Sequence, residues 1–109
     1  MPMNDFVQVT TTTEREEDAR QIADLLVERR LAACVQIVGP ISSVYRWQGK
    51  VESAREWQCL VKTRHDLLDD VSDAIREIHP YEVPEIIAVP IVAGSREYLT
   101  WLEEQTSPS

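Results

Sequence analysis

The residues with the clearest chemical potential lie in one short segment, positions 79–85, which reads HPYEVPE. His79 and Glu85 offer an imidazole and a carboxylate, and both groups bind metal ions in proteins. The two prolines stiffen the segment, which could therefore hold both side chains on one wall of a cleft. A stiff connector between a helix and a strand explains the prolines equally well, and the negative end of a helix would stabilise a protonated His79. The segment is a candidate metal site with a structural interpretation left open.

Four further residues are candidates for a cleft or an interface: Trp47, Lys62, Tyr81 and Trp101. Lys62 ends an apolar stretch, where it could neutralise a bound anion, but we favour an ion pair with an acidic residue. We expect the tryptophans to anchor a core or an interface rather than to stack on a ligand, because large aromatic side chains dominate buried contacts.

Known catalytic patterns do not occur in the sequence. No serine or cysteine stands in a recognisable activating motif, and three glycines form neither a phosphate-binding loop nor a dinucleotide fingerprint. Cys34 and Cys59 are far apart and belong to no Cys-x-x-Cys pair, so we predict reduced, unlinked thiols. We therefore predict that the protein is not an enzyme, leaving open an acid–base pair assembled between subunits.

Length and charge narrow the class of protein further. A chain of 109 residues with 43% hydrophobic content matches one domain, which we place at residues 1–109. The formal net charge of -8 would repel a phosphate backbone, so nucleic acid is not an expected partner. No stretch approaches the roughly 20 apolar residues that span a bilayer, and residues 1–24 show no secretory pattern. We expect a cytoplasmic protein that does not bind membranes.

The periodicity predicts a strand order that could position these residues. We expect strands at 6–12, 32–47, 51–63 and 86–92, and helices from a capping box at Thr13 to about Arg30, from about Arg64 to His79, and after Gly94. This β-α-β-β-α-β order plus a C-terminal helix predicts an α+β, ferredoxin-like split βαβ sandwich with an antiparallel sheet. The second and fourth strands, which contain Pro40 and Pro90, are expected at the sheet edges.

The long central hairpin predicts an oligomer. Residues 32–47, if fully extended, would span roughly 50 Å. A compact domain of this length has a radius of gyration of only about 13 Å. Some of the hairpin should therefore project, leaving Val44, Tyr45, Trp47 and Val51 exposed unless another subunit covers them. The alternative is that Gly39-Pro40 folds this arm back over its own core.

The chain resembles the CutA family across nearly its whole length. The matching stretches are 28–34 (ERRLAAC), 45–50 (YRWQGK), 79–87 (HPYEVPEII) and Tyr98-Leu99 with Trp101. The resemblance implies a homotrimer of ferredoxin-like subunits, similar in architecture to the PII signalling proteins. It also implies a role in tolerance of copper and other divalent cations. A PII-like regulator that binds a small metabolite and a scaffold trimer without a ligand are the alternatives.

The resemblance also suggests a copper site, and this sequence departs from it. Some family members are thought to use a cysteine of the first strand with the histidine and the glutamate that match His79 and Glu85. Thr11 stands at the position of that cysteine. Copper(I) prefers a soft thiolate, so the change predicts weak binding of Cu(II) or Zn(II) and no tightly bound cofactor.

Overall fold

The structure is a computed structural model that describes residues 5–108. The elements in chain order are β1 (Phe6–Thr13), α1 (Glu16–Glu28), β2 (Cys34–Trp47), β3 (Lys50–Arg64), a 3-10 turn (His65–Leu67), α2 (Leu68–Ile78), β4 (Ile87–Pro90) and α3 (Arg96–Gln105). In this described range, no helix combines the length and the apolar character that a membrane crossing requires.

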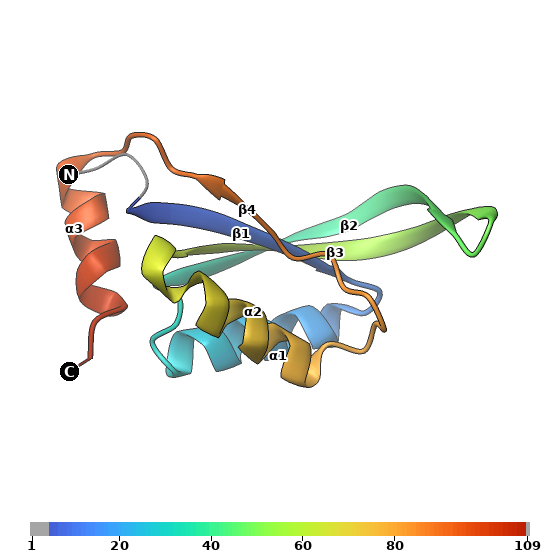
Figure 1. The fold of residues 1–109 in the computed structure, drawn as a ribbon, viewed down its shortest axis with the longest axis horizontal. Helices are drawn as coiled ribbons and strands as arrows, with labels where there is room; N and C mark the ends of the chain where they lie inside the picture. The colour runs from blue at the N-terminus through green and yellow to red at the C-terminus, as the bar shows by residue number, and fades with distance from the viewer. Residues whose placement is uncertain (1–4, 109) are drawn as a thin grey trace.

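The four strands form one antiparallel sheet in the order β2-β3-β1-β4. This confirms the predicted α+β split βαβ fold and the predicted edge positions of β2 and β4. Helices α1 and α2 lie side by side on one face of the sheet, whereas α3 lies across the end away from the hairpin tip (Figure 1). Each edge strand therefore has one side without a strand partner in the described chain.

The core lies between the sheet and the helix pair α1 and α2. Alternate residues of β1 and β3 point into it, as the two-residue period of a strand requires, and the helices contribute apolar residues at helical spacing. The fully buried apolar side chains there include Val9, Ile22, Leu26, Cys59, Val61, Val71 and Ile75. Burial in this layer is what fixes the register of the central strands.

The opposite face of the sheet presents apolar side chains to solvent. Ile87 and Val89 pair with Thr10 and Gln8 of β1, and they alternate with Ala88, which pairs with the buried Val9. Ile87 and Val89 are therefore directed away from the helix pair, and they are 55% and 50% exposed. This face of the β4 edge is a candidate contact surface.

Two predicted boundaries were wrong, that of the first helix and that of the fourth strand. The capping box at Thr13 does not form, because β1 continues to Thr13, whose hydroxyl donates to the carbonyl of Arg15, and α1 begins at Glu16. The second helix begins close to the predicted Arg64, as a 3-10 turn at His65 that continues into α2. Strand β4 covers Ile87–Pro90 only, although the Ile91 amide beyond it still donates to the carbonyl of Phe6 at 2.9 Å. Because hydrogen-bonded pairs alternate in an antiparallel ladder, the nitrogen of Pro90 faces away from β1, on the unpaired edge.

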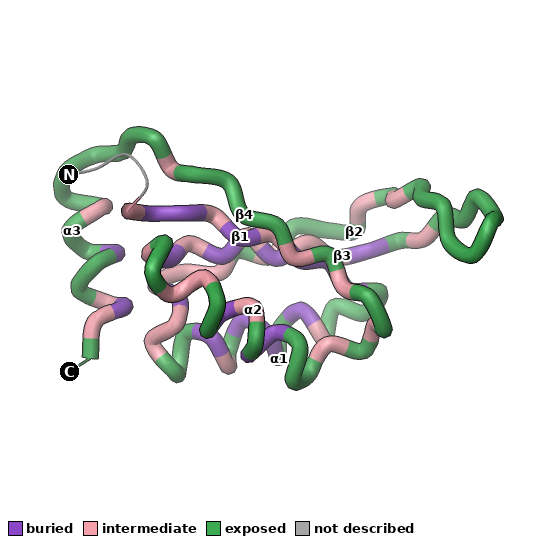
Figure 2. Tube along the Cα trace, viewed as in Figure 1, coloured by how far each residue is buried: buried purple, intermediate pink, exposed green. Residues whose placement is uncertain are grey.

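The outer half of the β2–β3 hairpin, residues 41–55, projects from the domain and is called the arm below (Figure 1). The register shifts between Val38 and Ile41, which confirms the bulge predicted at Gly39-Pro40. The arm does not fold back over the core: Val44 and Val51 are 72% and 67% exposed. The molecule measures 44 × 25 × 22 Å as a result. Figure 2 shows this exposure along almost the whole arm.

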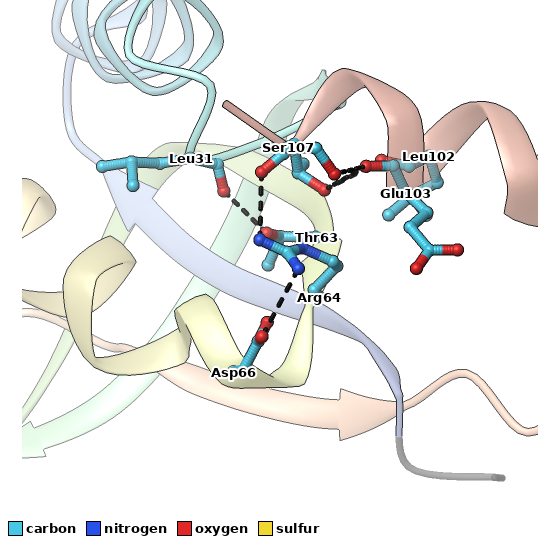
Figure 3. Close-up of polar contacts among 8 residues, drawn as sticks. Leu31, Thr63, Arg64, Asp66, Leu102, Glu103 and Ser107 are labelled. Carbon is cyan, nitrogen blue, oxygen red and sulfur yellow. Dashed lines mark hydrogen bonds and ion pairs between the residues drawn. The ribbon is translucent and has the colours of Figure 1, made fainter. Parts of the chain in front are cut away.

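The C-terminal helix is tied to the domain by two arginines. Nη1 of Arg30, a residue with a φ of 58°, donates to the carbonyls of Gln105 and Ser107 at 3.1 and 3.2 Å. Arg64 donates to the carbonyl of Thr106 at 3.1 Å and to the carboxylate of Asp66 at 3.4 Å (Figure 3). These bonds satisfy the carbonyls at the helix end, which have no partners within the helix.

Candidate functional site

A cleft of about 700 Å³ lies where the arm meets the connector between α2 and β4. The arm contributes residues 43–45 and Trp47, and the connector contributes residues 81–85. Thr12 near the end of β1, Glu14 just after that strand and Glu56 of β3 complete the lining. The hairpin register positions the arm, and the two prolines restrict the connector, so both walls are set by local backbone geometry.

Tyr81 and Glu56 join the two walls of the cleft. The Tyr81 hydroxyl donates to Oε2 of Glu56 at 2.7 Å, and Glu56 is only 7% exposed. Burial raises the pKa of Tyr81 above its usual range, and the hydrogen bond to Glu56 and its negative charge raise it further. The tyrosine therefore stays a neutral donor throughout the physiological range.

His79 connects the start of the connector to the end of β1. It ends α2 in an extended conformation, and its Nδ1 accepts the backbone N–H of Tyr81 at 3.1 Å. Nδ1 therefore carries no hydrogen, so Nε2–H donates to the carbonyl of Thr12, which is 2.8 Å away. Both ring nitrogens are engaged, and a metal ion could bind His79 only after one of these hydrogen bonds breaks.

The predicted site residues separate into two groups. Trp47, Tyr81 and Glu85 line the cleft together, whereas His79 lies behind it through its bonds to the backbone. Lys62 lies elsewhere and donates to the Gln36 side-chain oxygen of the neighbouring strand. Within residues 5–108 Lys62 forms no ion pair, so the pairing with an acidic residue that we favoured is not seen there.

Trp101 lies at the other end of the molecule. It belongs to α3, where its ring lies 5.4 Å from that of Tyr98, centroid to centroid. Trp101 is only half-buried, so it does not close the core, and it stays a candidate for an interface rather than for the cleft.

Sequence reasoning missed much of the cleft lining, namely Glu14, Tyr45, Glu56 and Glu82 as members of one site. Glu82 lies within residues 79–85, the segment proposed as a metal site from the sequence. Its position beside His79 and Glu85 could therefore have identified it. Glu56 pairs with Ile41 immediately after the bulge, and neither its burial nor its contact with Tyr81 follows from strand alternation. The bulge shifts the register there, which periodicity alone does not reveal.

The metal-binding side chains of the described residues do not form a complete copper site within the single chain. No group of three or more His, Cys, Asp or Glu side chains within residues 5–108 is arranged to hold one metal ion. Thr11 is fully buried opposite Cys59, and its hydroxyl has no hydrogen-bond partner. Thr11 therefore points into the core, whereas the neighbouring Thr12 lines the cleft.

The two cysteines are free, and they lie apart in the sheet. Cys59 pairs with Ile37 and Cys34 pairs with Lys62, in agreement with the predicted unlinked thiols. Burial raises the pKa of the Cys59 thiol to about 11, so this thiol is inert near neutral pH.

Comparison with known proteins gives one consistent result. Residues 7–105 match the family model described as CutA1 divalent ion tolerance protein. The divalent-cation tolerance protein CutA of Thermus thermophilus is 51% identical over 98 residues, which cover 90% of this chain and 95% of that protein. Human protein CutA is 42% identical over 87% of this chain, which spans only about half (53%) of the human protein. The crystal structure of CutA from Xylella fastidiosa superposes with a TM-score of 0.92 at 38% identity, covering 94% and 99% of the two chains.

Proposed function

The chain belongs to the CutA1 divalent ion tolerance family, and we propose that it forms a homotrimer that binds divalent cations in clefts between its subunits. The observation that carries this proposal is the cleft itself, which is acidic and bounded on one side by an uncovered arm. The names of the relatives describe tolerance of divalent cations, not a catalysed reaction.

Two unpaired strand edges support the assembly. Each subunit offers an edge on β2 and another on β4, and such edges bind other strands unless they are covered. Pairing different edges of successive subunits makes a head-to-tail contact, which closes into a ring when the rotation permits. The exposed side chains of the arm and of β4 would be buried in the same contacts, and each Å² of apolar surface covered contributes about 25 cal/mol.

The charge of the cleft supports a cation as its ligand. Glu14, Glu56, Glu82 and Glu85 line it, and no lysine, arginine or histidine of the described chain does. Negative charges in a concave site attract cations and raise their local concentration. The same charges oppose an anionic metabolite, which disfavours the PII-like alternative in its usual form.

The metal site that we propose is weak and shared between subunits. Glu85 supplies one carboxylate oxygen, and water and a neighbouring subunit complete the coordination of Zn(II) or Cu(II). His79 stays a proposed ligand, and its participation requires the loss of its bond to Thr12 or to the Tyr81 amide. Binding through His79 would weaken as the imidazole protonates at low pH.

Calorimetric titration with Zn(II) and Cu(II) at about pH 7.5, where imidazole is mostly neutral, tests this proposal. Protein without a tag or chelator is compared with Glu85→Gln, His79→Ala and the exposed α3 control Glu103→Gln. We expect weak binding that falls about tenfold in Glu85→Gln and His79→Ala, a loss of about 1.4 kcal/mol, and no change in Glu103→Gln. No binding by the unaltered protein would refute the metal proposal. Equal binding by His79→Ala would remove His79 from the ligand set.

A further inference from the structure

Three aromatic side chains share the cleft with its carboxylates. Tyr45 and Trp47 of the arm and Tyr81 of the connector all contribute to the lining. In the single chain the two arm residues are half-exposed, so part of each ring lines the cleft rather than the core. Aromatic rings attract ammonium groups through the negative charge of their faces, and tryptophan does so most strongly. A hydrated metal ion gains little binding energy from aromatic walls. An organic ammonium ion gains binding energy both from its charge over the rings and from the contacts of its methylene groups.

The carboxylates of the cleft come from separate segments. Glu14 follows β1, Glu56 lies in β3, and Glu82 and Glu85 lie in the connector. Within residues 5–108 no three acidic groups gather around one point where an ion could bind. The negative charge is therefore spread over a cavity of about 700 Å³. Spread charge suits a ligand that carries several positive groups at intervals along its length.

Of the four carboxylates, Glu56 would gain most from a nearby positive charge. It is more than nine-tenths buried, and the Tyr81 hydroxyl is the single donor that the described residues give it. None of the ion pairs within residues 5–108 includes it. A buried carboxylate without a counter-ion is costly, and a bound cation would remove much of that cost.

We infer that the cleft binds a linear polyamine, with ammonium groups at the carboxylates and methylene segments against Tyr45, Trp47 and Tyr81. The inference rests on the proposed function in one respect, the preference of the cleft for cations, and it adds the class of ligand. Unlike a metal ion, a polyamine requires no set of converging donors. It can therefore occupy the cleft with the side chains arranged as the structure shows them.

Calorimetric titration with spermidine at low salt tests the inference. The variants are Glu56→Gln, which removes the buried charge while keeping an acceptor for Tyr81, and Trp47→Leu, which removes an aromatic face of the cleft. Sedimentation velocity checks that both variants keep the assembly of the unaltered protein. Glu103→Gln is the matched control, because it makes the same change in net charge on an exposed residue of α3, far from the arm. We expect about a tenfold loss of spermidine affinity in each cleft variant, as removal of one charged or aromatic contact implies, and none in the control.

The possible outcomes separate this inference from the metal proposal. Spermidine binding that weakens in both cleft variants and not in Glu103→Gln supports the inference, whatever the result with zinc. Absence of spermidine binding, or equal weakening in Glu103→Gln, overturns it, because the attraction is then absent or spread over the whole acidic surface. Zinc binding that persists in that case leaves the proposed function intact. Failure of both titrations removes the cation preference itself.

Discussion

The two halves of the β2–β3 hairpin share one antiparallel ladder and differ in what covers them. In the inner half, Cys59, Val61 and Thr63 are fully buried beneath the helices. In the outer half, Val44 and Val51 protrude into solvent although they belong to the same two strands. Figure 2 shows the change from buried to exposed along β3. Alternation in sequence thus indicates a strand, but only the neighbouring elements decide whether its apolar residues form a core.

The Tyr81–Glu56 pair marks the boundary between these two regions. Glu56 lies just outside the last core position of β3, and the connector that carries Tyr81 crosses there. Glu56 is charged and nearly buried, whereas Val44 and Val51 of the arm are apolar and exposed. This reversal of the usual arrangement of polar and apolar residues is what indicates function at the cleft and assembly along the arm.

The largest expected effect comes from deleting a side chain of the covered region. Leu26 is fully buried, and Leu26→Ala should reduce the free energy of unfolding by about 2–5 kcal/mol, because the substitution leaves a cavity. Its neighbour Val27 is 45% exposed, and Val27→Ala should change that free energy by less than about 0.5 kcal/mol. Urea unfolding at one protein concentration measures both. Similar losses in the two variants would contradict the assignment of the core.

A smaller effect is expected at the boundary. Tyr81→Phe leaves Glu56 buried without its hydroxyl donor, and this should cost about 1–3 kcal/mol. Tyr45→Phe is the matched control, since no hydrogen bond to the Tyr45 hydroxyl is present within residues 5–108.

The same substitution should alter the pH dependence of stability. The pKa of Tyr81 is raised in the folded protein, so its contribution is complete below about pH 10, the ordinary value for tyrosine. Above that pH the unfolded chain loses the proton first, and stability falls as pH rises. Tyr98 and Cys59 have pKa values raised in the same direction, and both remain in the variant. The decline above pH 10 should therefore be shallower in Tyr81→Phe than in the unaltered protein; parallel curves would contradict the account.

The sequence predicted the topology well because the core elements have clear periods. The alternation of apolar residues at 57–63 predicted that one face of that strand is buried, and the apolar stripe through Val71 and Ile75 predicted the same for one face of the second helix. Both faces are buried in the structure. The helix start at Thr13 was missed because pairing with Trp57 keeps that residue in the sheet, and ladder bonds prevailed over a local cap.

The site was predicted only in part, because it is made by long-range contacts. Tyr81 and Glu85 were found from their own segment, but Glu56 joins them through a contact between residues 25 positions apart. Both ring nitrogens of His79 form hydrogen bonds, and one of them bonds to a backbone carbonyl of β1. The types of residue in the sequence do not reveal that contact. The bond of Lys62 to Gln36 was not predicted either, because strand pairing rather than charge brings Gln36 near it.

The central claim is that other copies of the chain cover the arm and the strand edges. Sedimentation velocity of the untagged protein at micromolar concentration tests it most directly. The account predicts one species with a mass close to three chains, because the bare arm and the unpaired edges of β2 and β4 are then buried. A clean monomer at that concentration, with its arm exposed as it is in the single chain, would contradict the account.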